Sequence, residues 1–455
     1  MNTTKVGLTL ALAEFAATTG YEDIPARVID RMKTYTLDCL AAGFVCARLP
    51  WARIVLDLAA EAGGRGESSV FGSPGLLSAS QAALVNGVMI GGFESEHVGH
   101  VSHPAGTVTP AALALAERDR VSGRQFLVAA ATGYEVVCRI GEGQTARTET
   151  IRGFHNPAVN GPFSAAAAAG RLLGFDTETM ASALGIAGSF SSGLTQYAFD
   201  GSMTKRLHLG HAARSGLEAA LLAAKGFTGP HAVLEGENGY FQAFSPDPKP
   251  ERVLPGLGRD WLLETLRIKA YACHATGQAI VAALQQLRRQ GIDLAAATRV
   301  SLHGQPGWAS SPRYQDHEPT TLMGAQYSVP FTIAVALVRD LDDPLRFDES
   351  AVSDEQIRKL AQLVTVADLE DEHDPEYSEL DLEVDGTEYH LECGPYRGSV
   401  RNPADFDDVA AKFRRFSRHL VGPTRQAEII DLVARLDEIA DISELTQMIR
   451  GEGGR

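Results

Sequence analysis

Apolar positions recur along most of the chain at spacings of three and four residues, the pattern of helices with one buried face. The segment after Asp23 and Pro25 carries Val28, Ile29 and Met32 at this spacing, and Pro25 suits the first turn of a helix. We therefore expect residues 1–60 to form two helices. The same pattern predicts further helices over residues 79–90, 108–118, 124–141 and 178–196, and from near Lys205 to Gly226.

The pattern changes near residue 266, where alternation of apolar and polar positions begins. The stretch ELDLEVDGTEYHLEC alternates on both sides of Asp385-Gly386, which predicts a β-hairpin with a tight turn. Helical periodicity returns over residues 404–450. We expect a mainly α protein, with an all-helical domain over residues 1–266 that is completed by C-terminal helices in 404–455, and a smaller α+β domain over residues 267–403.

A polar segment rich in histidine interrupts two apolar helical stretches between Gly91 and Glu117. It contains Glu94, Glu96, His97, His100 and His103. Pro104 and Gly106 are expected to break the helix here. A polar loop held between two apolar helices can point several titratable groups into one pocket, so we expect the functional site at this loop.

Composition and charge exclude several classes of protein. Apolar residues make up 44 % of the chain and aromatic residues 7 %, which favours closely packed helices. The net charge of −16 argues against a nucleic-acid partner. No stretch is long and uncharged enough to span a membrane, and five scattered cysteines lack a C-x-x-C pair. We expect a cytoplasmic protein with free thiols.

Known catalytic motifs are missing from the sequence. It has no phosphate-binding G-x-x-x-x-G-K-[ST], no G-x-G-x-x-G after a strand and no G-x-S-x-G nucleophile elbow. His97, His100 and His103 are spaced H-x2-H-x2-H, which would spread them around a helix, and zinc signatures use other spacings. We therefore expect no metal, although a zinc site at these histidines stays an alternative.

Histidines next to small or chain-breaking residues, together with two cations, suit a pocket for a small carboxylate. His103 precedes proline, while His155 and His274 stand in turn contexts. Lys205 and Arg206 come at the start of a helix, against its dipole, which suggests that an anion holds them there. Carboxylates bind to such donors, and proton transfer beside a carboxylate needs a positioned acid or base.

Four stretches of the sequence resemble the MmgE/PrpD family, which includes 2-methylcitrate dehydratases, cis-aconitate decarboxylases and iminodisuccinate epimerases. They are HPAGTVTPAALALAE, GFHNPAVNGPFSAAAAAGRLLGF, MTKRLHLGHAARSGLEAALLAAKGFTGP and IKAYACHATGQAIVAAL. Together they fall within residues 78–285, in the order the family has them. The resemblance implies a cofactor-free enzyme, usually a homodimer, with a large helical domain, a smaller α+β lid and a site between the two.

The resemblance also implies roles for particular residues. His103, His155, His274 and Lys205 match the catalytic positions, the histidines as proton-transfer groups and the lysine as a carboxylate anchor. We expect a substrate-binding set that consists of Arg206, Glu96, His97 and Tyr314. The family usually has an Asp-rich segment before its histidine loop, where this chain has FESEH, and this difference leaves the particular acid open.

Our leading hypothesis is a lyase that dehydrates or decarboxylates a small di- or tricarboxylate. An epimerase or racemase of an imino- or aminodicarboxylate would use the same proton abstraction. A catalytically silent paralogue that binds a carboxylate or a partner protein is the alternative outside enzymes, and the altered FESEH segment favours it. Which histidine acts as acid and which as base stays open at this point.

Overall fold

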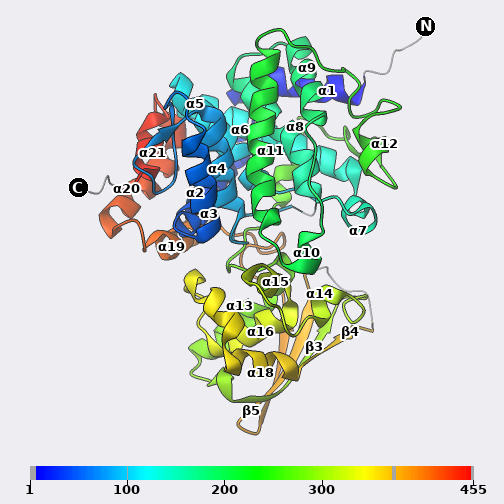
Figure 1. Cartoon of the computed structure of the whole chain (residues 1–455), viewed down its shortest axis with the longest axis vertical. Coiled ribbons are helices and arrows are strands. Elements are labelled where there is room, and N and C mark those ends of the chain that lie inside the picture. Colours follow the sequence, from blue (N-terminus) through cyan, green and yellow to red (C-terminus); the bar gives the residue numbers. More distant parts are fainter. Residues whose placement is uncertain (1–6, 100, 371–375, 452–455) are drawn as a thin grey trace.

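The computed structural model describes residues 7–99, 101–370 and 376–451. Figure 1 shows a large helical body and, below it, a smaller body that holds a β-sheet. The prediction of a mainly α protein with a large helical part and a smaller α+β part is confirmed.

The helical body begins with three helices, followed by a short hairpin and the helices that surround the core. Their bounds are α1 Leu8–Thr18, α2 Ala26–Cys46, α3 Pro50–Glu61, β1 Ser68–Ser69, β2 Leu76–Leu77, α4 Ala79–Gly91, α5 Pro104–Asp119, α6 Gly123–Gln144, α7 Arg147–Arg152, α8 Asn156–Leu172, α9 Thr177–Gly188, α10 Tyr197–Asp200, α11 Thr204–Ala223 and α12 Tyr240–Phe244.

Small residues let the central helices α4, α8 and α11 approach closely. A Cβ atom added at Gly210 of α11 would lie 2.2 Å from the carbonyl oxygen of Leu84 in α4, and one at Gly216 would lie 2.3 Å from that of Pro162 in α8. The five alanines from Ala165 to Ala169 are fully buried. The alanine-rich stretch of the sequence is therefore a packing face, and it brings the start of α11 close to the loop after α4.

Three local predictions differ from the structure. Residues 7–60 form α1, α2 and most of α3, because Pro50 begins a third helix rather than ending the second. Pro104 does not break a helix either; it occupies the first turn of α5, where its missing N–H costs nothing, and His103 is the N-cap. The helix predicted over residues 178–196 ends earlier, at Gly188.

The smaller body contains a four-stranded sheet in the order β4-β3-β5-β6. β3 pairs parallel to β4 and antiparallel to β5, and β5 and β6 form the predicted hairpin, with Val384 opposite Thr387 across Asp385-Gly386. The bounds are α13 Gln278–Arg289, β3 Ala297–Gly304, α14 Pro312–Gln315, α15 Leu322–Tyr327, α16 Val329–Val338, α17 Glu349–Ser353, α18 Glu355–Leu363, β4 Val364–Asp368, β5 Ser378–Val384 and β6 Thr387–Cys393.

The chain then returns to the helical body through α19 (Phe406–Ser417), α20 (Pro423–Ala434) and α21 (Ser443–Ile449), of which α19 packs on α2 (Figure 1). The domain boundary at residues 266 and 267 stays a prediction. A β-bridge between Val98 and Arg267 lies at this boundary. It joins the loop between α4 and α5 to the segment that leads into the smaller body.

No single helix of the described residues is long and apolar enough to cross a membrane; only α2 and α3 taken together have the required composition, and they bend by 92° where they meet.

Candidate active site

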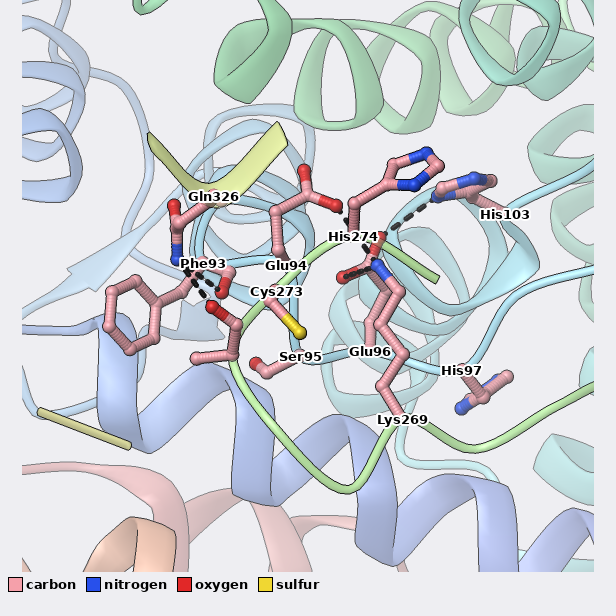
Figure 2. Close-up of polar contacts among 12 residues, drawn as sticks. Phe93, Glu94, Ser95, Glu96, His97, His103, Lys269, Cys273, His274 and Gln326 are labelled. Atoms are coloured by element: carbon pink, nitrogen blue, oxygen red, sulfur yellow. Dashed lines mark hydrogen bonds and ion pairs between the residues drawn. The ribbon is translucent and has the colours of Figure 1, made fainter. Parts of the chain in front are cut away.

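The loop between α4 and α5 carries two buried carboxylates. Glu94 adopts a left-handed backbone conformation with φ of 56°, which is uncommon for a residue other than glycine. Its side chain and that of Glu96 are almost completely shielded from solvent. Figure 2 shows both carboxylates pointing toward the same lysine, Lys269. A strained backbone and two buried charges in one short loop are features that cluster at functional sites.

Two lysines from distant parts of the chain neutralise these carboxylates. Lys205, in the first turn of α11, forms a buried ion pair with Glu94. Lys269 lies with its Nζ 3.0 Å from Oε2 of Glu94 and 3.7 Å from Oε2 of Glu96. Lys205 therefore does have an anionic partner at the helix start, and that partner belongs to the protein. Burial lowers the pKa of Lys269, and the nearby Glu96 carboxylate opposes this effect.

His103 is bound to one of the same carboxylates. Its Nδ1 lies 2.9 Å from Oε1 of Glu96 (Figure 2). Burial alone would raise the pKa of Glu96, but the Lys269 ammonium and the hydrogen bond from His103 hold it below its ordinary value. Glu96 is therefore ionised at neutral pH and can only accept a hydrogen bond. It follows that Nδ1 of His103 carries a proton, and Nε2 is the nitrogen that can gain or lose one.

His155 is the N-cap of α8 and meets a second histidine from α11. Its Nδ1 lies 3.1 Å from Nδ1 of His208, and both rings are buried. The ring of His155 also lies against that of His103, with centroids 6.1 Å apart. The backbone N–H of His155 donates to the carbonyl of Gly193, which fixes the turn that presents the ring.

His274 comes from the segment that enters the smaller body. Its Nδ1 accepts from the backbone N–H of Thr276 at 3.4 Å and lies 2.9 Å from the Thr276 hydroxyl. The ring packs on Tyr327 of α15 at 4.9 Å. With Nδ1 acting as an acceptor, a neutral His274 carries its proton on Nε2.

Five of these side chains line a single cavity of about 320 Å³, which is within the range of small-molecule sites: Glu94, His103, His155, Lys269 and His274. Arg267 and Glu376, which form an ion pair at 3.3 Å, stand at its wall. The cavity is lined by Glu94, Val98, Gly99, His103, Ala146, Glu149, Thr150, His155, Asn156, Arg267, Lys269, His274, Ala275, Thr276, Ala279, Trp308, Tyr327, Glu376 and Tyr396. Its wall therefore combines residues of both bodies.

A buried polar chain holds the carboxylate loop from behind. Nδ1 of His97 lies 2.8 Å from Asp38 and Nε2 lies 2.9 Å from the hydroxyl of Tyr134. Lys412 of α19 donates to the other Asp38 oxygen at 2.6 Å and to the carbonyl of Ser95. His97 was predicted to contact the substrate, but it does not line the cavity; it anchors the loop to α2 and α6.

Arg206 and Tyr314 also lie behind the cavity lining, as does the Lys205 side chain. The guanidinium of Arg206 stacks over Trp51 at 3.6 Å and donates to the carbonyl of Gly92, so it fixes the start of the carboxylate loop. Tyr314 stacks on Trp308, which itself lines the cavity. The predicted contact of these two residues with substrate stays a prediction, and the geometry gives both a supporting position.

The structure thus brings together His103, His155 and His274, with Lys205 and Glu96 one contact behind them. Sequence reasoning did not name Lys269, and it placed Glu94 in the expected site loop without giving it a role. Lys269 lies in the stretch IKAYACH that carried part of the family resemblance, so its signal was present. Glu94 was noted as a departure from the family pattern, but its ion pairs with Lys205 and Lys269 were not predicted.

Among the described residues, no group of three histidine, cysteine, aspartate or glutamate side chains is arranged to hold a metal ion. His100, the middle histidine of the predicted zinc alternative, lies outside those residues. All five cysteines are buried free thiols. A second cavity, of about 340 Å³, adjoins the first at Gly99, Arg267 and Glu376, but its described lining contains no histidine or lysine.

A helical body, a smaller α+β body and a cavity between them that gathers histidines and a lysine define a protein of the MmgE/PrpD class. The family models agree: the MmgE/PrpD N-terminal domain matches residues 10–253 and the C-terminal domain matches residues 271–438. The chain belongs to the MmgE/PrpD family.

Curated relatives are similar over nearly their full length. The chain is 31 % identical to a cis-aconitate decarboxylase of Aspergillus terreus, over 98 % of this chain and 96 % of the relative. It is 29 % identical to a cis-aconitate decarboxylase-like protein of Aspergillus oryzae, over 94 % of each. It is 28 % identical to the human cis-aconitate decarboxylase, over 93 % of this chain and 91 % of the relative.

Proposed function

We propose that this protein is a lyase that decarboxylates cis-aconitate or a closely related unsaturated tricarboxylate. The observation that supports this most is the convergence of His103, His155, His274 and Lys269 in one cavity. The similar proteins named as cis-aconitate decarboxylases support the same reaction class. A dehydratase of the 2-methylcitrate type would use the same groups and is included in the test below.

The charges around the cavity explain how an anionic substrate can be held. Glu94 and Glu96 balance Lys205 and Lys269, so the buried cluster has no net charge of its own. Lys269 and Arg267 remain the cations in the lining, and the three histidines supply further donors. When the substrate binds, its carboxylates can take the place of some of the glutamate side chains that pair with Lys269 and Arg267.

The proposed reaction needs one proton and no oxidant. In cis-aconitate, the carboxylate on the saturated carbon leaves as CO2, and the electron pair of the broken C–C bond forms a new double bond to the central carbon. The electrons of the former double bond move to the carbon next to another carboxylate, where they are held as an enolate-like anion. A proton delivered to that carbon gives a dicarboxylate with a terminal methylene group. Cations near the anion stabilise it.

His103 is the acid that we assign to this step. Ionised Glu96 accepts a hydrogen bond from Nδ1–H of His103. When Nε2 also carries a proton, the ring is an imidazolium that remains paired with the buried Glu96 carboxylate. The carbanion takes the Nε2 proton, and Nδ1 keeps its bond to Glu96 throughout. Glu96 thereby orients the ring and stabilises its charged form, as a carboxylate does in other histidine-based sites.

The spacing of His103 and His155 argues against this pair as the acid and base of an epimerase. An epimerase holds its carbon between an acid and a base, each roughly 3 Å from that carbon, so the two nitrogens stand about 6 Å apart and the ring centres farther. The rings of His103 and His155 have centroids only 6.1 Å apart and pack edge to face. These two rings therefore leave no room between them for a substrate carbon.

The assay uses the purified protein with cis-aconitate, citrate and 2-methylcitrate. We expect CO2 release from cis-aconitate and, in D2O, a product that carries one deuterium on the newly protonated carbon, seen by proton NMR. His103→Gln and Lys269→Met should abolish this turnover, while His211→Gln, at a half-buried position of α11 that does not line the cavity, should not. Thermal stabilisation by carboxylates without turnover would instead support the silent paralogue, and loss of optical rotation without an alkene product would support the epimerase.

The predicted homodimer and cytoplasmic location remain proposals. Sedimentation of the purified protein measures the first of them directly.

A further inference from the structure

His155 and His208 share a hydrogen bond between their Nδ1 atoms, so the position of the proton on one ring depends on the other ring. The two Nδ1 atoms are 3.1 Å apart, so one of them must donate and the other must accept. Both rings are buried, and Tyr197 of α10 packs edge-on against each, with centroids at 5.4 and 5.7 Å. The pair is therefore held in one arrangement by three elements, α8, α10 and α11.

His208 is neutral at physiological pH. Burial, together with the charges of Lys205 and His211 on the same helix, lowers its pKa to about 4. The groups that face it from other elements are His155 of α8 and the phenol ring of Tyr197. A neutral imidazole has one N–H and one nitrogen lone pair. Which nitrogen of His208 carries the proton therefore decides which nitrogen of a neutral His155 carries one.

We propose that His208 is a positioning residue that donates its Nδ1–H to Nδ1 of His155 and thereby makes His155 a neutral donor, through Nε2–H, to a substrate carboxylate. This inference rests on the proposed function, because it assumes an anionic ligand in the cavity. In the opposite arrangement a neutral His155 would turn an Nε2 lone pair toward that anion, which is repulsive.

A second histidine of the same cavity is arranged in the same way. Nδ1 of His274 accepts from the backbone N–H of Thr276, which leaves the proton of neutral His274 on Nε2. His103 differs from both, because its Nδ1 faces an ionised carboxylate. The cavity thus contains one histidine equipped to transfer a proton and two equipped to bind carboxylates, which separates roles that the sequence left open.

The direct test is nitrogen-15 NMR of the histidine side chains in the ligand-free protein. We expect His208 as the Nδ1–H tautomer, which is the minor form of histidine in water, and His155 as the Nε2–H tautomer. His155→Gln and His208→Asn spectra assign the signals. His208 found as the Nε2–H tautomer would overturn the proposal. Because this measurement needs no turnover, it stands whether or not the chain decarboxylates cis-aconitate.

Kinetics provide the second test. His208→Leu removes the donor that orients the His155 ring and should raise KM about 10-fold, the usual effect of leaving a buried hydrogen-bonding group without its partner, with a smaller change in kcat. His208→Asn can place an amide N–H where Nδ1 stood and should restore most of the affinity. His211→Asn, one turn further along α11, is the matched control. An unchanged KM in His208→Leu, or an equal loss in His211→Asn, would contradict the proposal. If His208→Leu does not fold, the tautomers measured by NMR and the KM of His208→Asn still test the proposal.

Discussion

Nζ of Lys269 lies 3.0 Å from Oε2 of Glu94, and this ion pair joins the segment that enters the smaller body to the loop after α4. The two residues are 175 positions apart in the chain. Because Lys269 also lines the cavity, one side chain both connects the two bodies and forms part of the cavity wall. The site can therefore form only when both bodies are in place.

Replacement of Lys269 should affect activity and stability together. Lys269→Met leaves Glu94 with Lys205 and leaves Glu96 with His103, so part of the buried negative charge loses its partner. We expect a loss of about 3 kcal/mol in the free energy of unfolding, measured by urea denaturation, and a loss of cis-aconitate turnover. Normal turnover in this variant would remove Lys269 from the substrate site.

Glu96→Gln should separate orientation from charge at His103. The amide keeps nearly the same shape but can no longer stabilise a protonated imidazole at 2.9 Å. We expect kcat to fall by about 100-fold or more, in line with the contribution of a positioned acid, while KM changes little. A fall in kcat/KM that comes from KM alone would show that Glu96 serves binding instead.

Arg206 should contribute to stability more than to substrate affinity. Its guanidinium stacks on Trp51 and donates to the Gly92 carbonyl and to Gln326, and burial lowers its pKa to about 10. Arg206→Met loses these contacts and should lower the free energy of unfolding by about 2 kcal/mol. We expect a much smaller rise in KM than in Lys269→Met, measured in parallel at the same temperature.

Asp38 should make the free energy of unfolding depend on pH in the acidic range. Burial alone would raise its pKa, but Lys412 and His97 lower it below the ordinary value of 3.8. Because the unfolded chain then binds the proton first, the contribution of Asp38 is complete well above pH 4 and falls as pH drops through 4 and below. Asp38→Asn should be less stable than the wild type at pH 7, and the gap should narrow near pH 4 in denaturation experiments. A constant gap would exclude this linkage.

Gly210→Ala should destabilise the protein although alanine favours helices. On an exposed helix this change would stabilise by about 1 kcal/mol. Here the new Cβ would lie 2.2 Å from the Leu84 carbonyl oxygen, so α4 and α11 must move apart. We expect a lower Tm and, because α11 carries Lys205 and His208, a loss of activity as well. Gly422→Ala tests whether the effect is local, since a Cβ there meets no atom within 4 Å and the backbone φ of −70° suits alanine.

Local patterns predicted much of the secondary structure. The hairpin around Asp385-Gly386 and the helix that begins near Pro25 follow from alternation, periodicity and turn chemistry, which act over a few residues. Pro104 was predicted to break a helix although it begins one, because proline suits a first turn as well as it ends a helix. Only the packing around the proline decides between the two.

The sequence by itself determined the fold class, the family and the histidines, because periodicity and motif order are properties of the chain. Tertiary structure alone decided which polar groups face the cavity. It placed Lys269 in the lining and set Arg206 and His97 behind it, and it gave His103 and His155 different partners on Nδ1. The physical reason is that the ionisation and the tautomer of a buried group depend on neighbours a few ångströms away, and these neighbours lie from 7 to 175 residues away in sequence.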